Sequence, residues 1–211
     1  PSKNALIDEL KKSGLKIDVI DGNKEAELIR ELIEYEFPLK KKNYLLIDIG
    51  GGSLELNLYC KGVHDRSLSL DLGTVRMLNS EESYDQALKA VWPQVEDFLG
   101  KEADKDIEIL GTGGNFRQLM KISKSTGPVE TLDRKDVISL SKEMREMPVE
   151  KRIVKYKLKP DRARVMVPAL YILEFFLKKL KASKLHCCRY GLVQAILLES
   201  LRRHQESSLT S

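Results

Sequence analysis

The stretch 44–59, YLLIDIGGGSLELNLY, places a carboxylate and three glycines between two apolar segments. Asp48 comes near the end of the first segment, and the glycines at 50–52 are followed by Ser53. Consecutive glycines allow a tight turn with positive φ, and they leave no side chain in the path of an approaching anion. Because several N–H groups of such a turn can face one point, the turn is suited to binding a phosphate group.

Asp48 cannot itself bind a phosphate, because the two negative charges repel each other. Its carboxylate is suited instead to a Mg²⁺ ion or a water molecule beside the phosphate. The alternative is that the glycines only connect two strands of a hairpin, although a two-residue turn is enough for that. The segment is not a Walker loop, since the lysine and spacing of that motif are absent and a strand follows instead of a helix.

A second glycine turn occurs in the stretch 109–119, ILGTGGNFRQL, between a short apolar strand and a helix. Gly111, Gly113 and Gly114 precede the helix, so N–H groups at its amino end are open to an anion. Arg117 follows one turn into this helix. The glycine spacing does not match the dinucleotide fingerprint. Close packing of the helix on the strand explains the turn equally well.

The surrounding elements must position these two turns. Alternating apolar residues predict a strand at 15–20 and an antiparallel meander at 44–49, 54–60 and 65–72, with a further strand at 106–111 and a strand and turn at 184–191. Helical periodicity predicts helices at 5–12, 24–37, 83–100, 133–147, 159–180 and 192–203. We expect Pro93 to kink or split its helix, and Asp133 to act as an N-cap. Two glycine turns and a meander together indicate the actin-like ATPase architecture, in which each of two lobes carries a phosphate loop.

The composition is that of a globular protein, with 211 residues, 42% hydrophobic and 32% charged. The net charge of +4 is weak evidence for an anionic partner, since a solvated basic surface explains it as well. Cys60, Cys187 and Cys188 form no disulfide pattern, and the scattered histidines give no zinc site. We expect a reducing compartment and, without a targeting or membrane-spanning segment, the cytoplasm.

The chain resembles the exopolyphosphatase and guanosine pentaphosphate phosphohydrolase family, the Ppx/GppA group, over about residues 6–201. The stretches that match family motifs, in order, are VIDGNKEAELI, LLIDIGGGSLEL, LDLGTVRM, GTGGNFRQL, DRARVMVPALYIL and RYGLVQAILLE. The resemblance implies an α/β fold, the actin-like (ribonuclease H-like) ATPase lobe, with a mixed sheet that contains an antiparallel meander and is flanked by helices. It also implies hydrolysis of a terminal phosphoanhydride, in inorganic polyphosphate or guanosine pentaphosphate, with Mg²⁺ as the cofactor.

The same resemblance implies roles for individual residues. Glu25 is the general base that activates water, Asp48 binds the metal or positions the water, and Glu55 assists as a second catalytic carboxylate. The phosphate-binding residues that it implies are Gly50, Gly51, Gly52, Ser53 and Arg162. Arg76 and Arg117 are weaker candidates. Without the resemblance, Glu25 is a glutamate that complements a helix dipole, and Glu55 is an outward-facing strand residue.

The resemblance also implies a two-lobed enzyme of which this chain holds the second lobe. We expect residues 1–40 to form the tail of the first actin-like lobe and a crossing helix, 41–205 to form the second lobe, and 206–211 to be a frayed tail. The partners expected are polyphosphate or guanosine pentaphosphate, the missing first lobe of the same protein and, as one form of assembly, a second copy in a homodimer. No membrane is expected to take part. The chain alone is expected to be nearly inactive.

Some positions depart from the family pattern, namely Glu27, Leu54, Arg164, Val193, Gln194 and Ala195. Glu27 and Val193 make the cleft less cationic, whereas Arg164 acts the other way. One alternative to an enzyme is therefore a divergent, non-catalytic module that binds polyphosphate or a nucleotide for regulation. Another is an actin-like kinase or chaperone ATPase lobe, against which the lack of a longer adenosine-pocket motif argues.

Overall fold

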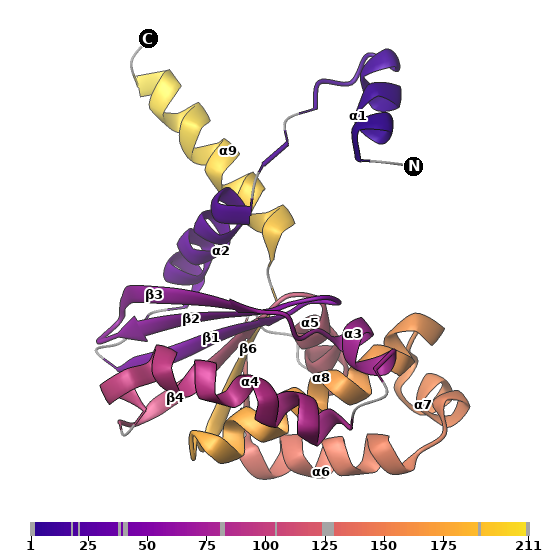
Figure 1. Ribbon diagram of the computed structural model, residues 1–211. Helices are drawn as coiled ribbons and strands as arrows, with labels where there is room; N and C mark the ends of the chain where they lie inside the picture. The colour runs from indigo at the N-terminus through magenta and orange to yellow at the C-terminus, as the bar shows by residue number, and fades with distance from the viewer. Residues whose placement is uncertain are drawn as a thin grey trace.

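A six-stranded mixed sheet forms the centre of the computed structural model (Figure 1), which describes residues 3–17, 19–20, 22–37, 39, 42–80, 83–103, 105–123, 129–189 and 191–209. The strands are β1 (Asn43–Ile49), β2 (Leu54–Cys60), β3 (Val63–Leu70), β4 (Ile107–Thr112), β5 (Val129–Asp133) and β6 (Lys184–Cys188). Their order is β3-β2-β1-β4-β6-β5. The expected antiparallel meander is confirmed, because β2 pairs antiparallel with both β1 and β3.

The pairing of β1 with β4 brings the two glycine turns together. These strands are parallel, with Asp48 opposite Thr112. Because parallel strands end at the same edge of a sheet, the turn after β1 and the turn after β4 must lie side by side. A contact between segments more than sixty residues apart in sequence is thus fixed by strand register.

Helices cover both faces of the sheet. Figure 1 shows α2 (Gly22–Glu36) and α9 (Leu192–Leu209) on one side, and α4 (Tyr84–Leu99), α6 (Arg134–Glu146) and α8 (Pro160–Lys179) on the other. The shorter helices are α1 (Lys3–Lys12), α3 (Thr74–Leu78), α5 (Gly114–Ile122), α7 (Val149–Tyr156) and the 3-10 turn Gly100–Glu102. In the same view α1 stands apart from the sheet.

Alternation along β1 decides which way Asp48 faces. Ile47 and Ile49 join the larger core, on the side of α4 and α8. Tyr44 and Leu46 join the smaller core on the opposite face, with Ile33 of α2. Since successive strand residues point to opposite faces, Asp48 lies on the face covered by α2, at the carboxyl end of the strand.

The expected strand at 15–20 is wrong, and of the two outcomes expected at Pro93, a kink or a split, the split does not occur. The predicted strand at 15–20 is not formed, since its described residues, 15–17 and 19–20, have no regular structure and Leu15 and Val19 are exposed. A strand needs a neighbour for its backbone hydrogen bonds, and no strand of the described chain pairs there. Pro93 does not split its helix, because α4 continues through it. Asp133 does occupy the N-cap of α6, but its side chain makes no capping hydrogen bond.

The two longest helices, α8 and α9, have 20 and 18 residues. Neither they nor the other helices of the described chain combine the length and apolar character needed to cross a membrane. Pro160 occupies the first turn of α8, where its fixed φ suits a helix start. Helix α9 continues to Leu209, past the lobe end expected at 205.

A buried carboxylate fixes α8, which carries Arg162, against α6. Glu174 accepts hydrogen bonds from Ser141 Oγ at 2.7 Å, Arg145 Nη1 at 2.9 Å and Lys178 Nζ at 2.6 Å. Burial raises the pKa of Glu174, but the hydrogen bonds from Lys178 and Ser141 and the charge of Arg145 outweigh it, so the pKa lies below its usual value. Because the pKa of Glu174 is lower in the folded state than in the unfolded state, ionised Glu174 stabilises the fold at any pH above the unfolded-state pKa. This stabilisation is lost as the pH falls through the folded-state pKa.

Glu174→Gln is therefore expected to lower the free energy of unfolding by about 2 kcal/mol at neutral pH, because charge-assisted hydrogen bonds are lost. Urea denaturation across a titration from neutral pH into acid should show the difference from the wild type shrinking as the pH falls. Glu146→Gln is the control, since its exposed carboxylate lies 4.0 Å from Lys142 and should contribute little. A difference that is constant over the titration would contradict the assignment.

Candidate functional site

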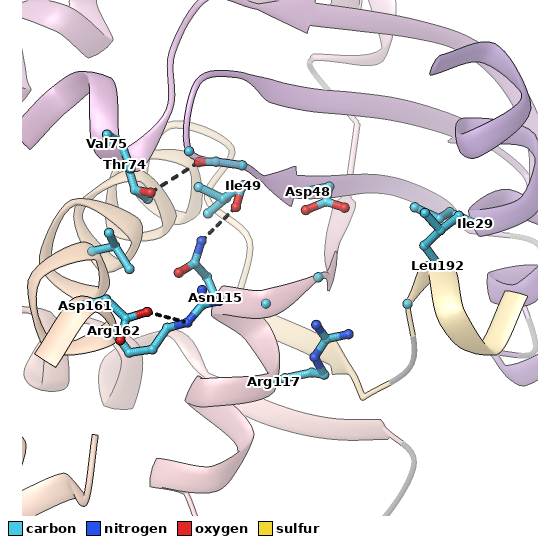
Figure 2. A pocket seen from close by; sticks show the side chains of 16 residues that line it. Ile29, Asp48, Ile49, Thr74, Val75, Asn115, Arg117, Asp161, Arg162 and Leu192 are labelled. Atoms are coloured by element: carbon cyan, nitrogen blue, oxygen red, sulfur yellow. Dashed lines mark hydrogen bonds and ion pairs between the residues drawn. The ribbon is translucent and has the colours of Figure 1, made fainter. Parts of the chain in front are cut away.

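A cavity of about 520 Å³ lies at the carboxyl edge of β1 and β4. Figure 2 shows its wall, which is formed by the end of β1, both glycine turns and the amino ends of α3, α5, α8 and α9, with Ile29 of α2 on one side. Helix amino ends carry partial positive charge and unpaired N–H groups. The amino ends of α5, α8 and α9 thus favour an anion in the cavity, whereas the first N–H groups of α3 donate to the carbonyls of Gly50 and Gly51.

The first glycine turn is held by its carbonyl groups. The N–H of Gly50 donates to the carbonyl of Ser53 at 2.9 Å, which closes the turn. The carbonyl of Gly50 accepts hydrogen bonds from the N–H of Thr74 at 3.0 Å and from its Oγ1 at 3.3 Å. The carbonyl of Gly51 accepts from the N–H of Val75 at 2.9 Å. The start of α3 thus binds the turn's carbonyl oxygens, and the N–H of Gly51 has no acceptor in the described chain.

Gly73 and Arg76 support the same turn from the α3 side. A methyl group on Gly73 would lie 2.3 Å from the carbonyl oxygen of Gly51 and 2.5 Å from the nitrogen of Gly52. Arg76 Nε donates to the carbonyl of Gly52 at 3.1 Å, and its Nη2 lies 3.3 Å from Asp71. Arg76 therefore holds the turn and does not line the cavity. The sequence contained Gly73 in LDLGTVRM, but nothing there showed what it touches.

The second glycine turn contacts Asp48 directly. Gly113 has a φ of +94°, and a methyl group there would lie 2.4 Å from Asp48 Oδ1. A methyl group on Gly114 would lie 3.3 Å from Arg162 Nη1. The turn thus needs glycine at 113 for its conformation as well as for space. Asp48 and Arg162, both predicted from the sequence as site residues, therefore lie against the same second glycine turn.

Asn115, which the sequence reasoning missed, ties the two turns together. Its Nδ2 donates to the carbonyl of Ile49 at 2.7 Å, directly before the first glycine turn. The side chain lines the cavity and is only 6% exposed, yet its Oδ1 has no partner among the described residues. Because buried acceptors are normally paired, we expect a bound water or ligand to donate there.

Asn115→Ala is expected to lower the free energy of unfolding by about 2 kcal/mol, because the carbonyl of Ile49 loses its hydrogen bond inside the protein. Lys121→Ala on the same helix is the control, since Lys121 is exposed. Urea denaturation of both variants tests this expectation. Equal losses would show that the bond between the turns contributes nothing measurable.

Two of the arginines predicted as site residues, Arg162 and Arg117, line the cavity. Arg162, predicted to bind phosphate, lines the cavity with its Nε 3.6 Å from Asp161. Arg117, a weaker candidate, also lines it. Figure 2 shows their guanidinium groups on either side of the start of α5.

Other predicted residues lie outside the cavity wall. Glu55 is opposite Asp48 in the register of β1 and β2, but it accepts a hydrogen bond from Ser69 Oγ at 2.8 Å and does not line the cavity. Gly50 and Gly51 line the cavity, whereas Gly52 and Ser53 do not. The roles implied for Glu55, Gly52 and Ser53 therefore remain predictions.

Glu25 belongs to α2, but its side chain lies outside the described part of the chain. Position 25 is one helical turn before Ile29, which lines the cavity. Residues four apart in a helix share a face. The predicted base thus occupies the helical face of α2 that borders the cavity.

The acidic, histidine and cysteine side chains of the described residues can be compared with the ligands that a metal ion requires. The described residues contain no cluster of three or more histidine, cysteine or acidic side chains. Mg²⁺ commonly binds through only one or two carboxylates, completed by substrate phosphates and waters. Asp48, beside the glycine turn, fits that mode of binding.

The model of the Ppx/GppA phosphatase family matches residues 8–204. The chain belongs to this family. An exopolyphosphatase from Cytophaga hutchinsonii is 24% identical, with a TM-score of 0.81 and coverage of 95% of this chain and 70% of that one. The Aquifex aeolicus member of the Ppx/GppA family is 20% identical, with a TM-score of 0.74 and coverage of 96% and 71%. These likenesses confirm the actin-like ATPase fold. No curated protein matches the chain significantly.

The positions that depart from the Ppx/GppA pattern do not line the cavity. Gln194 Oε1 accepts a hydrogen bond from the N–H of Gly191 at 3.1 Å, which is the part a glutamate or glutamine plays at the third position of a helix. Leu54 is in the core, and Val193 is exposed. The side chains present at these positions therefore take no part in the cavity wall of this chain.

Proposed function

We propose that the protein hydrolyses the terminal phosphoanhydride bond of inorganic polyphosphate in the presence of Mg²⁺. The observation that carries this proposal is that a glycine turn, helix amino ends, Asp48 and Arg162 converge on one cavity. Such a site offers backbone N–H groups and positive charge for phosphoryl oxygens. The fold shared with an exopolyphosphatase supports polyphosphate as the substrate.

Each part of the cavity has a role in this proposal. The turn formed by Gly50, Gly51, Gly52 and Ser53 binds the terminal phosphate, and Arg162 neutralises charge on the chain. Asp48 holds Mg²⁺, which supplies charge neutralisation of the phosphoryl oxygens when bound. Glu55 lies opposite Asp48 on the neighbouring strand, and its proposed role is to assist the metal ion or the water.

Glu25 is proposed to act as the general base. A water oxygen forms a bond to the terminal phosphorus while the bridging P–O bond breaks, and Glu25 accepts a proton from the water. One orthophosphate is released, and the remaining chain ends in a phosphate group. The helical position of Glu25, one turn before Ile29, supports this role.

A first lobe is proposed to complete the cleft. The matched region covers 70% and 71% of the two solved structures, so those proteins contain further chain. In an actin-like enzyme the substrate lies between two lobes, as the resemblance implies. The 211-residue chain by itself is therefore expected to bind phosphate but to release little of it from polyphosphate.

The non-catalytic alternative is less well supported, because the departures from the family pattern lie outside the cavity wall. Guanosine pentaphosphate is a second candidate substrate, since the apolar side chains of Val75 and Val165 line the cavity and suit a nucleobase.

The test measures phosphate release by the protein with both lobes, from long-chain polyphosphate and from guanosine pentaphosphate, with Mg²⁺ and with EDTA. Calorimetry measures binding of the same compounds. We expect Mg²⁺-dependent release from polyphosphate. Binding without release would support a regulatory module, and faster release from guanosine pentaphosphate would make that the substrate. No binding of either compound would refute the proposed function.

A further inference from the structure

Arg117 is a cavity residue to which the function proposed above gives no task. It lies one turn into α5, it is exposed, and its side chain forms no ion pair or hydrogen bond with the described residues. An exposed arginine is normally solvated, so it is the position of Arg117 in the cavity wall, and not its lack of a partner, that points to a role. The guanidinium of Arg117 is thus available to a ligand.

Gly191 provides the space that Arg117 occupies. A methyl group on Gly191 would lie 2.8 Å from Arg117 Nη1. Gly191 and Leu192, at the amino end of α9, line the cavity as well. The guanidinium therefore lies against the amino end of α9, close to the backbone of Gly191.

The two arginines are on different sides of the cavity. Arg162 comes from α8, together with Asp161 and Val165, while Figure 2 shows Arg117 on the other side of the start of α5, below Asp48. The α2 residue Ile29 and the α9 residue Leu192 lie together at that second side. Helix α2, to which residue 25 belongs, therefore borders the cavity on this side.

We propose that Arg117 is a catalytic residue that binds the phosphoryl group under attack, while Arg162 binds the part of the chain that leaves. This proposal rests on the proposed phosphohydrolase function. In phosphoryl transfer, negative charge develops on the oxygens of the transferred group and of the leaving group, and an arginine beside the transferred group stabilises the transition state more than the bound substrate. Arg117 is placed for that task because it lies on the side of Asp48 and α2.

The test compares steady-state kinetics of polyphosphate hydrolysis by the protein with both lobes. We expect Arg117→Gln to lower kcat about 100-fold, while KM and the calorimetric affinity for polyphosphate change less than about threefold. Arg117→Lys should regain part of the rate. Added guanidinium should partly restore the rate of Arg117→Ala, which a merely structural role would not allow.

Arg164→Gln serves as the control for loss of one positive charge. Arg164 is exposed on α8 and does not line the cavity. Its substitution should therefore leave kcat and KM near their wild-type values. The proposal is overturned if Arg117→Gln raises KM at unchanged kcat, or if it behaves as Arg164→Gln does. If the wild type binds polyphosphate but releases no phosphate, the proposed phosphohydrolase function is refuted. If the wild type is active and the Arg117 variant has the same kinetic constants, only the role of Arg117 is refuted.

Discussion

Glutamine in place of Glu25 is expected to reduce phosphate release from polyphosphate by about 10²–10⁴-fold, which is the usual contribution of a positioned general base. The affinity for polyphosphate should stay within about threefold of wild type, because the amide keeps the size of the side chain and removes only its ability to accept a proton. Phosphate release by the protein with both lobes and calorimetric binding to the same preparation measure the two quantities.

The control for this substitution is Glu31→Gln on the same helix. Glu31 pairs with Arg202 of α9 at 3.2 Å and does not line the cavity, so its loss should leave the rate nearly unchanged. Full activity of Glu25→Gln would show that another group activates the water. Loss of binding together with activity would instead place Glu25 among the groups that hold the substrate or its metal ion.

The parts of the fold with strong local patterns could be predicted from sequence. The alternation of Leu54, Leu56 and Leu58 predicted a half-buried strand, and all three are fully buried. Helices α7, α3 and strand β5 were not foreseen, because short elements carry little periodicity. β5 has five residues and is defined by its pairing with β6, whose sequence lies more than fifty residues away.

The residues of the candidate site likewise fall into those that the sequence indicated and those that only the structure revealed. Asp48, Gly50, Gly51 and Arg162 carry a recognisable motif, and all four line the cavity. Asn115 and Gly73 act through contacts with segments 66 and about 22 residues distant, and only the folded chain reveals such contacts. Sequence motifs therefore indicated which groups line the cavity, whereas the groups that hold them in place became visible only in the structure.

Alanine at Gly73 is expected to be far more damaging than alanine at Gly52, although Gly52 belongs to the glycine motif. A methyl group on Gly73 would meet backbone atoms of Gly51 and Gly52 at 2.3–2.5 Å, and backbone cannot rotate away as a side chain can. A methyl group on Gly52 would meet nothing within 4 Å. We expect Gly73→Ala to lower the free energy of unfolding by about 3 kcal/mol and Gly52→Ala to change it by less than about 0.5 kcal/mol.

The same pair of variants separates two explanations of the first glycine turn. One explanation is that glycine is needed only where another part of the backbone comes close. In that case Gly52→Ala, which keeps the N–H groups of the turn, should bind phosphate as the wild type does. Gly73→Ala should bind phosphate weakly, because its methyl group displaces the turn. Urea denaturation and calorimetric phosphate binding on the 211-residue chain measure both effects. Strong loss of binding in Gly52→Ala with unchanged stability would mean that the ligand itself passes within contact of position 52, and the phosphate would then lie closer to that residue than to the cavity wall at Gly50 and Gly51.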